Sequence, residues 1–240
     1  MNITLIGYGK MGKQVERSAL ARGHSIDLII DSKTPLKREH FDNSDVYIDF
    51  STRSAVLDNV KAAAAAGKNI VIGTTGWDDL LPEVAAIVLH ANIACIHSPN
   101  FSIGIALFHH LVKQAAQKFA GYPHYDVGGY EIHHKQKADS PSGTAKALLS
   151  TLIHELPNKQ SALHHAIDRP ITEDELHFAS IRTGAFPGTH TVFFDSPYDT
   201  VTLTHQARTR EGFAEGAVIA AEWLQGKHGI FTMDDLLTGV

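Results

Sequence analysis

The first hundred residues alternate short apolar runs with stretches of helical periodicity. The apolar runs are NITLI (2–6), HSIDLIID (24–31), DVYIDF (45–50), KNIVIG (68–73) and NIACIHS (92–98). Between them lie stretches with helical spacing, such as RSAVLDNVKAAAAAG (53–67) and DDLLPEVAAIVLH (78–90). Parallel strands need crossover connections of about a dozen residues, usually helices. The alternation therefore predicts an α/β fold: a Rossmann-like, doubly wound parallel sheet with helices on both faces.

The pattern changes after Ser102. A long helix is predicted over 103–121, then a strand over 125–134, a polar loop and a helix from about Ser142 to His154. Three β segments follow without intervening helices: HFASIRTG (177–184), THTVFFDS (189–196) and DTVTLTHQA (199–207). The last alternates threonine with apolar residues at period 2, which is typical of a sheet with one open face. We expect a second, α+β domain built on a mixed or antiparallel open sheet.

A final amphipathic stretch, FAEGAVIAAEWLQG (213–226), is too short to form a domain together with the remaining C-terminal residues. We expect it to pack back onto the first domain. The predicted organisation is a first domain over 1–103, completed by 211–240, and a second domain over 104–210.

A glycine fingerprint joins the first strand to the first helix. Gly7, Gly9 and Gly12 form G-x-G-x-x-G, a spacing that permits a tight turn, close approach of backbone N–H groups to a pyrophosphate, and close helix–strand packing. Asp31 ends the second apolar run and can accept hydrogen bonds from ribose hydroxyls. Its charge favours NADH over NADPH, although Ser32 and Lys33 could partly accommodate a 2′-phosphate.

Two further loops come after strand ends at the same edge of the sheet. They are GTTGW (73–77) and SPNFS (98–102). Ligands of open α/β sheets bind beside the carboxyl ends of the strands, so these loops are placed to contact the nicotinamide half of the cofactor. Simple turn formation by glycine and asparagine explains the same residues equally well.

Composition narrows the function classes. A net charge of −5 excludes a global basic field, so we expect neither a nucleic-acid nor a membrane partner, but a small molecule. About 18 consecutive apolar residues, enough for a membrane span, occur nowhere, and the N-terminus lacks a basic region; we expect a cytoplasmic protein. The single cysteine, Cys95, lies in an apolar run and is expected to be buried.

Sixteen histidines raise the question of a metal site. The pairs His109-His110, His133-His134 and His164-His165 are adjacent in sequence, so their side chains point to different faces. No H-x-x-x-H or C-x-x-C spacing accompanies them. We expect no metal.

The stretch EIHHKQKADSPSGTA (131–145) concentrates candidate chemistry. A strand ending at His133 places an imidazole at the sheet edge, and the following loop carries Lys137. A helix then starts at Ser142, and its free N–H groups at Gly143 and Thr144 can bind a carboxylate. A proton donor, a cation and an anion cradle within 15 residues favour acid catalysis on an anionic substrate. A solvated loop before a capped helix is the alternative.

Several of these motifs resemble the 4-hydroxy-tetrahydrodipicolinate reductase family, also called dihydrodipicolinate reductases. The resemblance rests on GYGKMGK, VIGTTGW, SPNFSIG, GTHTVFF, LTHQARTREGFAEGAV and above all EIHHKQKADSPSGTA, and it covers nearly the whole chain. It implies NAD(P)H-dependent reduction of a cyclic dicarboxylate, with loss of water, in lysine and diaminopimelate biosynthesis. It also implies a homotetramer formed through the sheet of the second domain.

The resemblance assigns roles to individual positions. His133 would be the proton donor, and Lys137 a second donor or a substrate anchor. His134, Gly143 and Thr144 would bind the substrate carboxylates. The cofactor would be held by Gly7, Tyr8, Gly9, Lys10, Met11, Gly12, Asp31, Gly73, Thr74, Thr75, Ser98, Pro99, Asn100 and Phe101.

Two other functions are consistent with parts of the pattern. One is another Rossmann oxidoreductase that acts on an amino-acid semialdehyde; acylating enzymes of that kind need a nucleophilic cysteine in a loop. The other is a dinucleotide-sensing protein without chemistry, which would have no use for His133 and Lys137.

Overall fold

The computed structural model describes residues 1–31, 34 and 43–239, which form two compact units. Unit 1 comprises Met1–Ala106 and Glu211–Val240, and unit 2 comprises Leu107–Arg210. Ser32 and Lys33, which could partly accommodate a 2′-phosphate, lie outside the described residues. Among the described helices, none is both long and apolar enough to cross a lipid bilayer.

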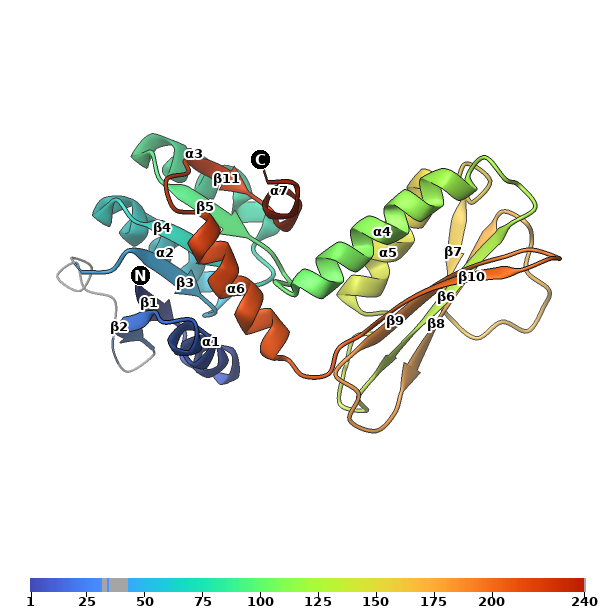
Figure 1. Ribbon diagram of the computed structural model, residues 1–240, viewed down its shortest axis with the longest axis horizontal. Helices are drawn as coiled ribbons and strands as arrows, with labels where there is room; N and C mark the ends of the chain where they lie inside the picture. The colour runs from blue at the N-terminus through green and yellow to red at the C-terminus, as the bar shows by residue number, and fades with distance from the viewer. Residues whose placement is uncertain (32–33, 35–42, 240) are drawn as a thin grey trace. The chain divides into compact units, whose positions relative to one another are not determined.

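Unit 1 is built around a parallel sheet, in the order β11-β5-β4-β3-β1-β2 (Figure 1). Its strands are β1 (Asn2–Ile6), β2 (Ser25–Ile30), β3 (Val46–Asp49), β4 (Asn69–Ile72), β5 (Ala94–His97) and β11 (Gly229–Phe231). The sheet confirms the predicted Rossmann-like class. The central strands β3, β4 and β5 are almost wholly buried, as expected of strands covered on both faces.

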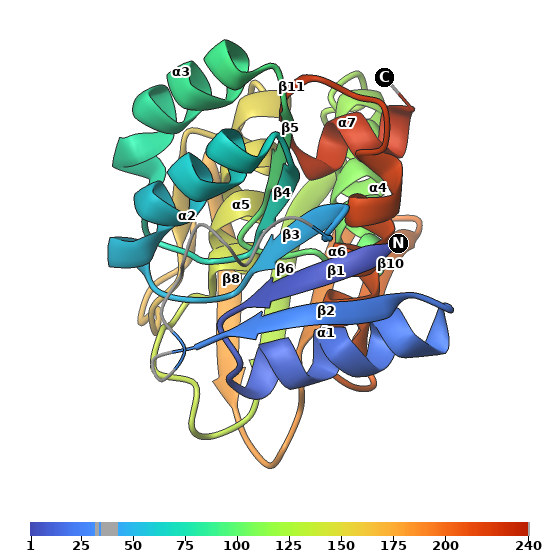
Figure 2. The ribbon, with the colours of Figure 1, turned by 90° about the vertical axis from the view of Figure 1, so that its left-hand side faces the viewer.

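Helices cover both faces of this sheet, as Figure 2 shows. They are α1 (Lys10–Ala21), α2 (Arg53–Ala66), α3 (Leu81–Ala91), α6 (Glu211–Trp223) and α7 (Met233–Thr238), with a short 3-10 helix at Asp78–Leu80. Residues of α1, α6 and α7 pack with one set of strand side chains, including Leu5 and Ile48. Residues of α2 and α3 pack with the alternate set, including Tyr47 and Ile70.

Unit 2 contains a mixed sheet, in the order β10-β9-β6-β8-β7. Its strands are β6 (Asp126–His133), β7 (Ser161–Leu163), β8 (Glu175–Arg182), β9 (Thr189–Asp195) and β10 (Thr200–Gln206). β6 pairs antiparallel with β9 and parallel with β8, so the sheet is mixed, as predicted. The sequence pattern missed the three-residue strands β7 and β11.

Two helices pack against one face of the mixed sheet. They are α4 (Ile103–Phe119), which begins in unit 1, and α5 (Gly143–Glu155). Leu148 and Leu152 of α5 and Val112 of α4 form a buried cluster with Phe178 and Val192 from the sheet. Residues 131–145, which concentrate the candidate chemistry, lie where β6 ends and α5 begins, so this core positions them.

Candidate active site

The glycine loop of unit 1 lies at the point where the strand order reverses. From β1 the chain continues to β2 on one side and later to β3 on the other, which creates the crevice where open α/β sheets bind ligands. Gly7 has φ +89°, and a Cβ added at Gly12 would lie 2.1 Å from the carbonyl oxygen of Gly7. A Cβ at Gly9 would meet no described atom within 4 Å, so there is room above this backbone. The residues present therefore fit a pyrophosphate.

The other residues of the loop have defined positions. Lys10 and Met11 lie in the first turn of α1. The Tyr8 hydroxyl donates a hydrogen bond to Glu16 of the same helix. Asp31 follows β2 directly and accepts a hydrogen bond from the Thr34 amide at 3.0 Å.

The loop after β4 directs its first threonine inward. The Thr74 hydroxyl donates to Asp49 at 3.1 Å and accepts from the Ser51 amide at 2.9 Å. Thr74 is buried, whereas Thr75 is exposed. Any contact of Thr74 with a cofactor is therefore left to its backbone.

The loop after β5 is held together by its own polar groups. Ser98 Oγ donates to the Asn100 carbonyl at 2.8 Å and accepts from the Asn100 amide at 3.1 Å, while Pro99 is exposed. The Phe101 ring is 1% exposed and packs edge-on against Phe50. Its side chain belongs to the core, so a cofactor could contact only the backbone there.

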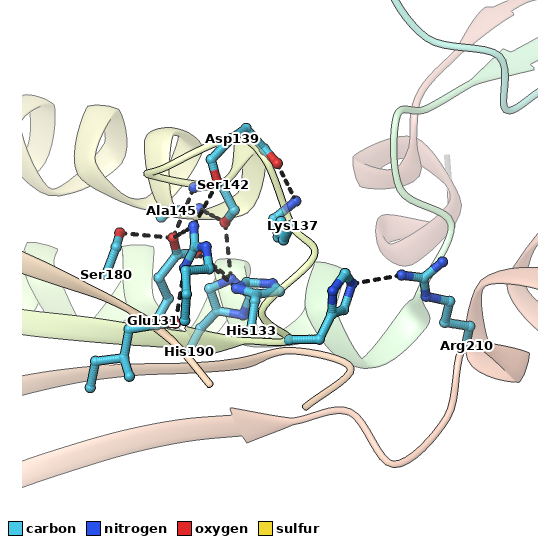
Figure 3. A network of polar contacts seen from close by, with 12 residues as sticks. Glu131, His133, Lys137, Asp139, Ser142, Ala145, Ser180, His190 and Arg210 are labelled. Atoms are coloured by element: carbon cyan, nitrogen blue, oxygen red, sulfur yellow. Dashed lines mark hydrogen bonds and ion pairs between the residues drawn. The ribbon is translucent and has the colours of Figure 1, made fainter. Parts of the chain in front are cut away.

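In unit 2, the end of β6 and the start of α5 bring the predicted chemical groups together (Figure 3). His133 is the last residue of β6 and is 7% exposed. Ser142 caps α5: its Oγ accepts a hydrogen bond from the Ala145 amide at 3.1 Å. Gly143 and Thr144 form the first turn of this helix, with Gly143 exposed. A helix N-terminus with exposed amides favours an anion.

Lys137 lies in the loop between these two elements. Its ammonium is 2.8 Å from Oδ1 of Asp139, and this hydrogen bond lowers the pKa of the Asp139 carboxyl. The His134 side chain is half-buried, and its Nε2 lies 2.9 Å from Nη2 of Arg210. Lys135 and Gln136 are exposed, as expected of a solvent-facing part of the loop.

Three residues that the sequence pattern did not single out complete this site: Glu131, Arg182 and His190. Glu131 is fully buried, and its Oε1 accepts from Nη2 of Arg182 at 2.9 Å. Its Oε2 lies 3.3 Å from Nδ1 of His133 and 3.5 Å from Nε2 of His190. Burial by itself would raise the pKa of Glu131, but the contacts with His133, His190, Ser142 and Arg182 hold it well below its usual range. The carboxylate is therefore ionised.

Glu131, His133 and His190 are also the one group of described residues whose side chains could jointly hold a metal ion, with ligand atoms within 4.8 Å of one another. These three side chains come from two strands, so their spacing in the sequence could not reveal the group. The guanidinium of Arg182 already neutralises the carboxylate, which disfavours a divalent cation. Histidines 109, 110, 164 and 165 lie outside this group.

Comparisons with known proteins show the family to which this chain belongs. Residues 1–101 match the model "Dihydrodipicolinate reductase, N-terminus", and residues 104–237 match "Dihydrodipicolinate reductase, C-terminus". The chain is 39% identical over 238 residues to a 4-hydroxy-tetrahydrodipicolinate reductase of Christiangramia forsetii, covering 99% of this chain and 98% of that protein. It is 36% identical to one from Methanoculleus marisnigri, covering 88% and 79%.

Solved structures show the same fold. A dipicolinate-bound dihydrodipicolinate reductase from Paenisporosarcina sp. TG-14 has a TM-score of 0.79, with 23% identity and 97% of both chains covered. An amine dehydrogenase from Mycobacterium smegmatis has a TM-score of 0.62, with 12% identity and 98% and 95% covered. At these identities the structures support the fold alone. The two domain models and the full-length relatives carry the assignment: this chain belongs to the dihydrodipicolinate reductase family.

Proposed function

We propose that this chain is a 4-hydroxy-tetrahydrodipicolinate reductase of lysine and diaminopimelate biosynthesis. The observation that carries the proposal is the 39% identity to the C. forsetii reductase over essentially the full length of both chains. The reaction consumes 4-hydroxy-tetrahydrodipicolinate, reduced nicotinamide cofactor and one proton, and yields tetrahydrodipicolinate, oxidised cofactor and water.

The residues of unit 2 suit the proton and anion chemistry of this reaction. His133 is proposed as the proton donor, and Lys137 as a second donor or as a substrate anchor. The amides of Gly143 and Thr144 in the first turn of α5, with His134, are proposed to bind the carboxylates of the substrate. The dipicolinate-bound relative is consistent with a small dicarboxylate as ligand.

The loops of unit 1 are proposed to hold NADH or NADPH. Backbone amides from Gly7 to Gly12 would bind the pyrophosphate, and Asp31 the adenosine ribose. Gly73–Thr75 and Ser98–Phe101 would lie beside the nicotinamide. When bound, the cofactor supplies the hydride. The carboxylate of Asp31 disfavours a 2′-phosphate, so we propose a preference for NADH.

The uncovered face of the mixed sheet supports a proposed homotetramer. Tyr130, Ile132 and Phe193 are half-buried and Ile181 is 43% exposed, although α4 and α5 pack on the other face. Apolar side chains on an open sheet are typical of a surface that associates with another copy. Light scattering coupled to size-exclusion chromatography tests the stoichiometry.

The test of function generates the substrate in situ from pyruvate and aspartate semialdehyde with the upstream synthase. We expect loss of reduced-nicotinamide absorbance, faster with NADH than with NADPH. His133→Ala and Lys137→Ala should each reduce turnover, by roughly 100-fold or more for the general acid, with cofactor affinity unchanged. Lys135→Ala, an exposed lysine of the same loop, is the matched control. No absorbance loss with either cofactor would contradict the proposal.

The alternatives have less support. Burial raises the pKa of the Cys95 thiol far above its usual range, with a further contribution from Asp49, and Cys95 is fully buried. It therefore cannot serve as the nucleophile of an acylating semialdehyde oxidoreductase. A sensor without chemistry would tolerate the His133 and Lys137 substitutions without loss of its biological activity.

A further inference from the structure

The carboxylate of Glu131 is buried directly behind the proposed proton donor. Glu131 and His133 are two residues apart on β6, so their side chains lie on the same face of the sheet. Oε2 of Glu131 is 3.3 Å from Nδ1 of His133, and neither atom has a hydrogen-bond partner among the described residues. Oε2 therefore faces the imidazole and accepts no hydrogen bond from another described donor.

The other oxygen of Glu131 is held by three donors. Oε1 accepts from the Ser142 amide at 2.9 Å, from Ser180 Oγ at 2.8 Å and from Arg182 Nη2 at 2.9 Å. Ser180 is the register partner of Glu131 on β8, and Arg182 is the register partner of His133. Donors from the neighbouring strand and from the helix cap thus fix the plane of the carboxylate.

A second imidazole lies near the same oxygen, Oε2 of Glu131. His190 is the register partner of Glu131 on β9, and its Nε2 lies 3.5 Å from Oε2. The rings of His133 and His190 are 5.1 Å apart in an edge-on arrangement. Burial lowers the pKa of His190, and the nearby His133 lowers it further, against the opposing effect of Glu131. Burial thus disfavours a positive charge on His190, although its Nε2 lies close to the carboxylate.

We propose that Glu131 is a positioning residue for the reaction. Its carboxylate faces Nδ1 of His133 and keeps that nitrogen directed to the interior, so that Nε2 presents the proton to the substrate. Gly188 lies beside that atom: a Cβ added there would be 3.0 Å from Nε2 of His133. This inference rests on the proposed reductase function, in which His133 donates the proton.

The same carboxylate also fixes the two other parts of the substrate site. Its bond to the Ser142 amide anchors the start of α5, where Gly143 would bind a carboxylate. Arg182 donates to Glu131 and, at 2.6 Å, to the carbonyl oxygen of Asp139, in the loop that carries Lys137. One buried charge therefore connects the proton donor, the anion cradle and the lysine loop.

The charged and titratable groups around His133 come from β6, from the neighbouring strands β8 and β9, and from the loop after β6. Glu131 on β6 is negatively charged, Arg182 on β8 and Lys137 in the loop are positively charged, and His190 on β9 is a second imidazole. The cap of α5 contributes the uncharged Ser142 instead. Glu131 is the negative charge in contact with this imidazole, so its removal has a defined electrostatic sign.

The experiment measures kcat against pH for the wild-type enzyme, Glu131→Gln and Glu131→Asp. In Glu131→Gln, kcat near neutral pH should fall by at least about 10-fold. The alkaline limb of the profile, where a proton donor is lost, should move to lower pH, because the negative charge beside that donor has been removed. Glu131→Asp keeps the charge, so its alkaline limb should stay close to that of the wild type even where kcat is reduced. KM for the cofactor should not change in either variant.

Ser180→Ala is the matched control, because it removes one donor to Oε1 without changing any charge. Its alkaline limb should coincide with that of the wild type. A reduced kcat in Glu131→Gln with an unmoved alkaline limb would show that Glu131 is merely structural. An inactive wild-type enzyme would instead contradict the proposed function.

A measurement on the wild-type protein covers the case in which Glu131→Gln does not fold. With ¹⁵N-labelled histidine, the imidazole nitrogens of His133 are assigned by comparison with His133→Gln. We expect Nδ1 of His133 to carry a proton throughout the pH range in which the enzyme is active. A neutral ring with its proton on Nε2 and an unprotonated Nδ1 would overturn the positioning role.

Discussion

The backbone of Phe101 and the α-carbon of Gly216 are in close contact: a Cβ added at Gly216 would lie 1.7 Å from the carbonyl oxygen of Phe101. Phe101 ends the proposed cofactor loop after β5, and Gly216 lies in α6, more than a hundred residues later. The C-terminal helix therefore supports a loop of the N-terminal sheet directly, and only glycine permits the approach.

Gly216→Ala should destabilise unit 1 and weaken cofactor binding. The methyl group would meet backbone, which no rotamer change can relieve, so we expect a loss of about 1–3 kcal/mol and a higher KM for the nicotinamide cofactor. Urea unfolding and steady-state kinetics measure the two effects. Gly212→Ala, in the same helix, is the control, since its Cβ would meet only Ser102 Oγ at 3.9 Å. Equal stabilities of the two variants would contradict the prediction.

Gly188→Ala should impair turnover by displacing His133. The new methyl group would lie 3.0 Å from Nε2 and 3.4 Å from Cδ2 of that imidazole, and the backbone has φ +157°. We expect kcat to fall by about 10-fold or more, because small misplacements of catalytic groups are costly, with cofactor affinity unchanged. Gly184→Ala is also at positive φ, but its new Cβ would meet only the Phe186 ring at 3.8 Å, so it controls for backbone strain. An unchanged kcat in Gly188→Ala would show that this imidazole does not need its present position.

Asp139→Asn should strengthen binding of a dicarboxylate. Asp139 holds the ammonium of Lys137 at 2.8 Å, and a substrate carboxylate would have to compete with it. The pair is partly exposed, so the unfolding free energy should change by less than about 1 kcal/mol. Calorimetric titration with dipicolinate measures the affinity. Weaker binding in the variant would mean that Asp139 orients Lys137 for the ligand rather than competing for it.

Glu222 should contribute to acid sensitivity of unit 1. Its carboxylate bonds Arg22 at 2.7 Å and His24 at 2.8 Å, and the Arg22 contact is the main cause that lowers the pKa of Glu222 to about 2. A carboxyl whose folded pKa lies below its usual value stabilises the fold above that usual value, and the contribution is lost as pH falls toward 2.

The stability difference between wild type and Glu222→Gln should therefore be largest near neutral pH and vanish between about pH 4.5 and pH 2. Because about a third of the Glu222 side chain is exposed, we expect the difference in the free energy of unfolding to be less than about 1 kcal/mol. Urea unfolding at several pH values gives the difference. Glu83→Gln, whose exposed carboxylate is 3.8 Å from Lys61, is the control. A difference that is constant with pH would contradict the electrostatic origin.

Much of the fold depends on local pattern. The run NITLI became β1 with the predicted bounds, and the helix expected from about Ser142 to His154 spans Gly143–Glu155, with Ser142 as its cap. The strands β7 and β11, three residues each, were missed because so short a segment shows no periodicity. Both form through pairing with a neighbouring strand rather than through their own propensity.

Part of the candidate site could likewise be predicted from local sequence, and part could not. Alternation along β6 was enough to place Glu131 beside His133, although the sequence interpretation did not use it. His190 and Arg182 had no such signal, because they reach Glu131 through strand register, which local sequence does not specify. The inward turn of Thr74 and the buried ring of Phe101 likewise depend on partners elsewhere in the chain.

The sequence by itself determined the two sheet classes, the glycine loop at the first strand–helix junction and the concentration of proton-handling groups in residues 131–145. These depend on periodicity, turn chemistry and residue type, which are local properties. Only the tertiary structure decided that a single buried carboxylate, Glu131, joins His133, the start of α5 and the Lys137 loop. The physical reason is that a buried charge is stable only where several distant segments bring their donors to it.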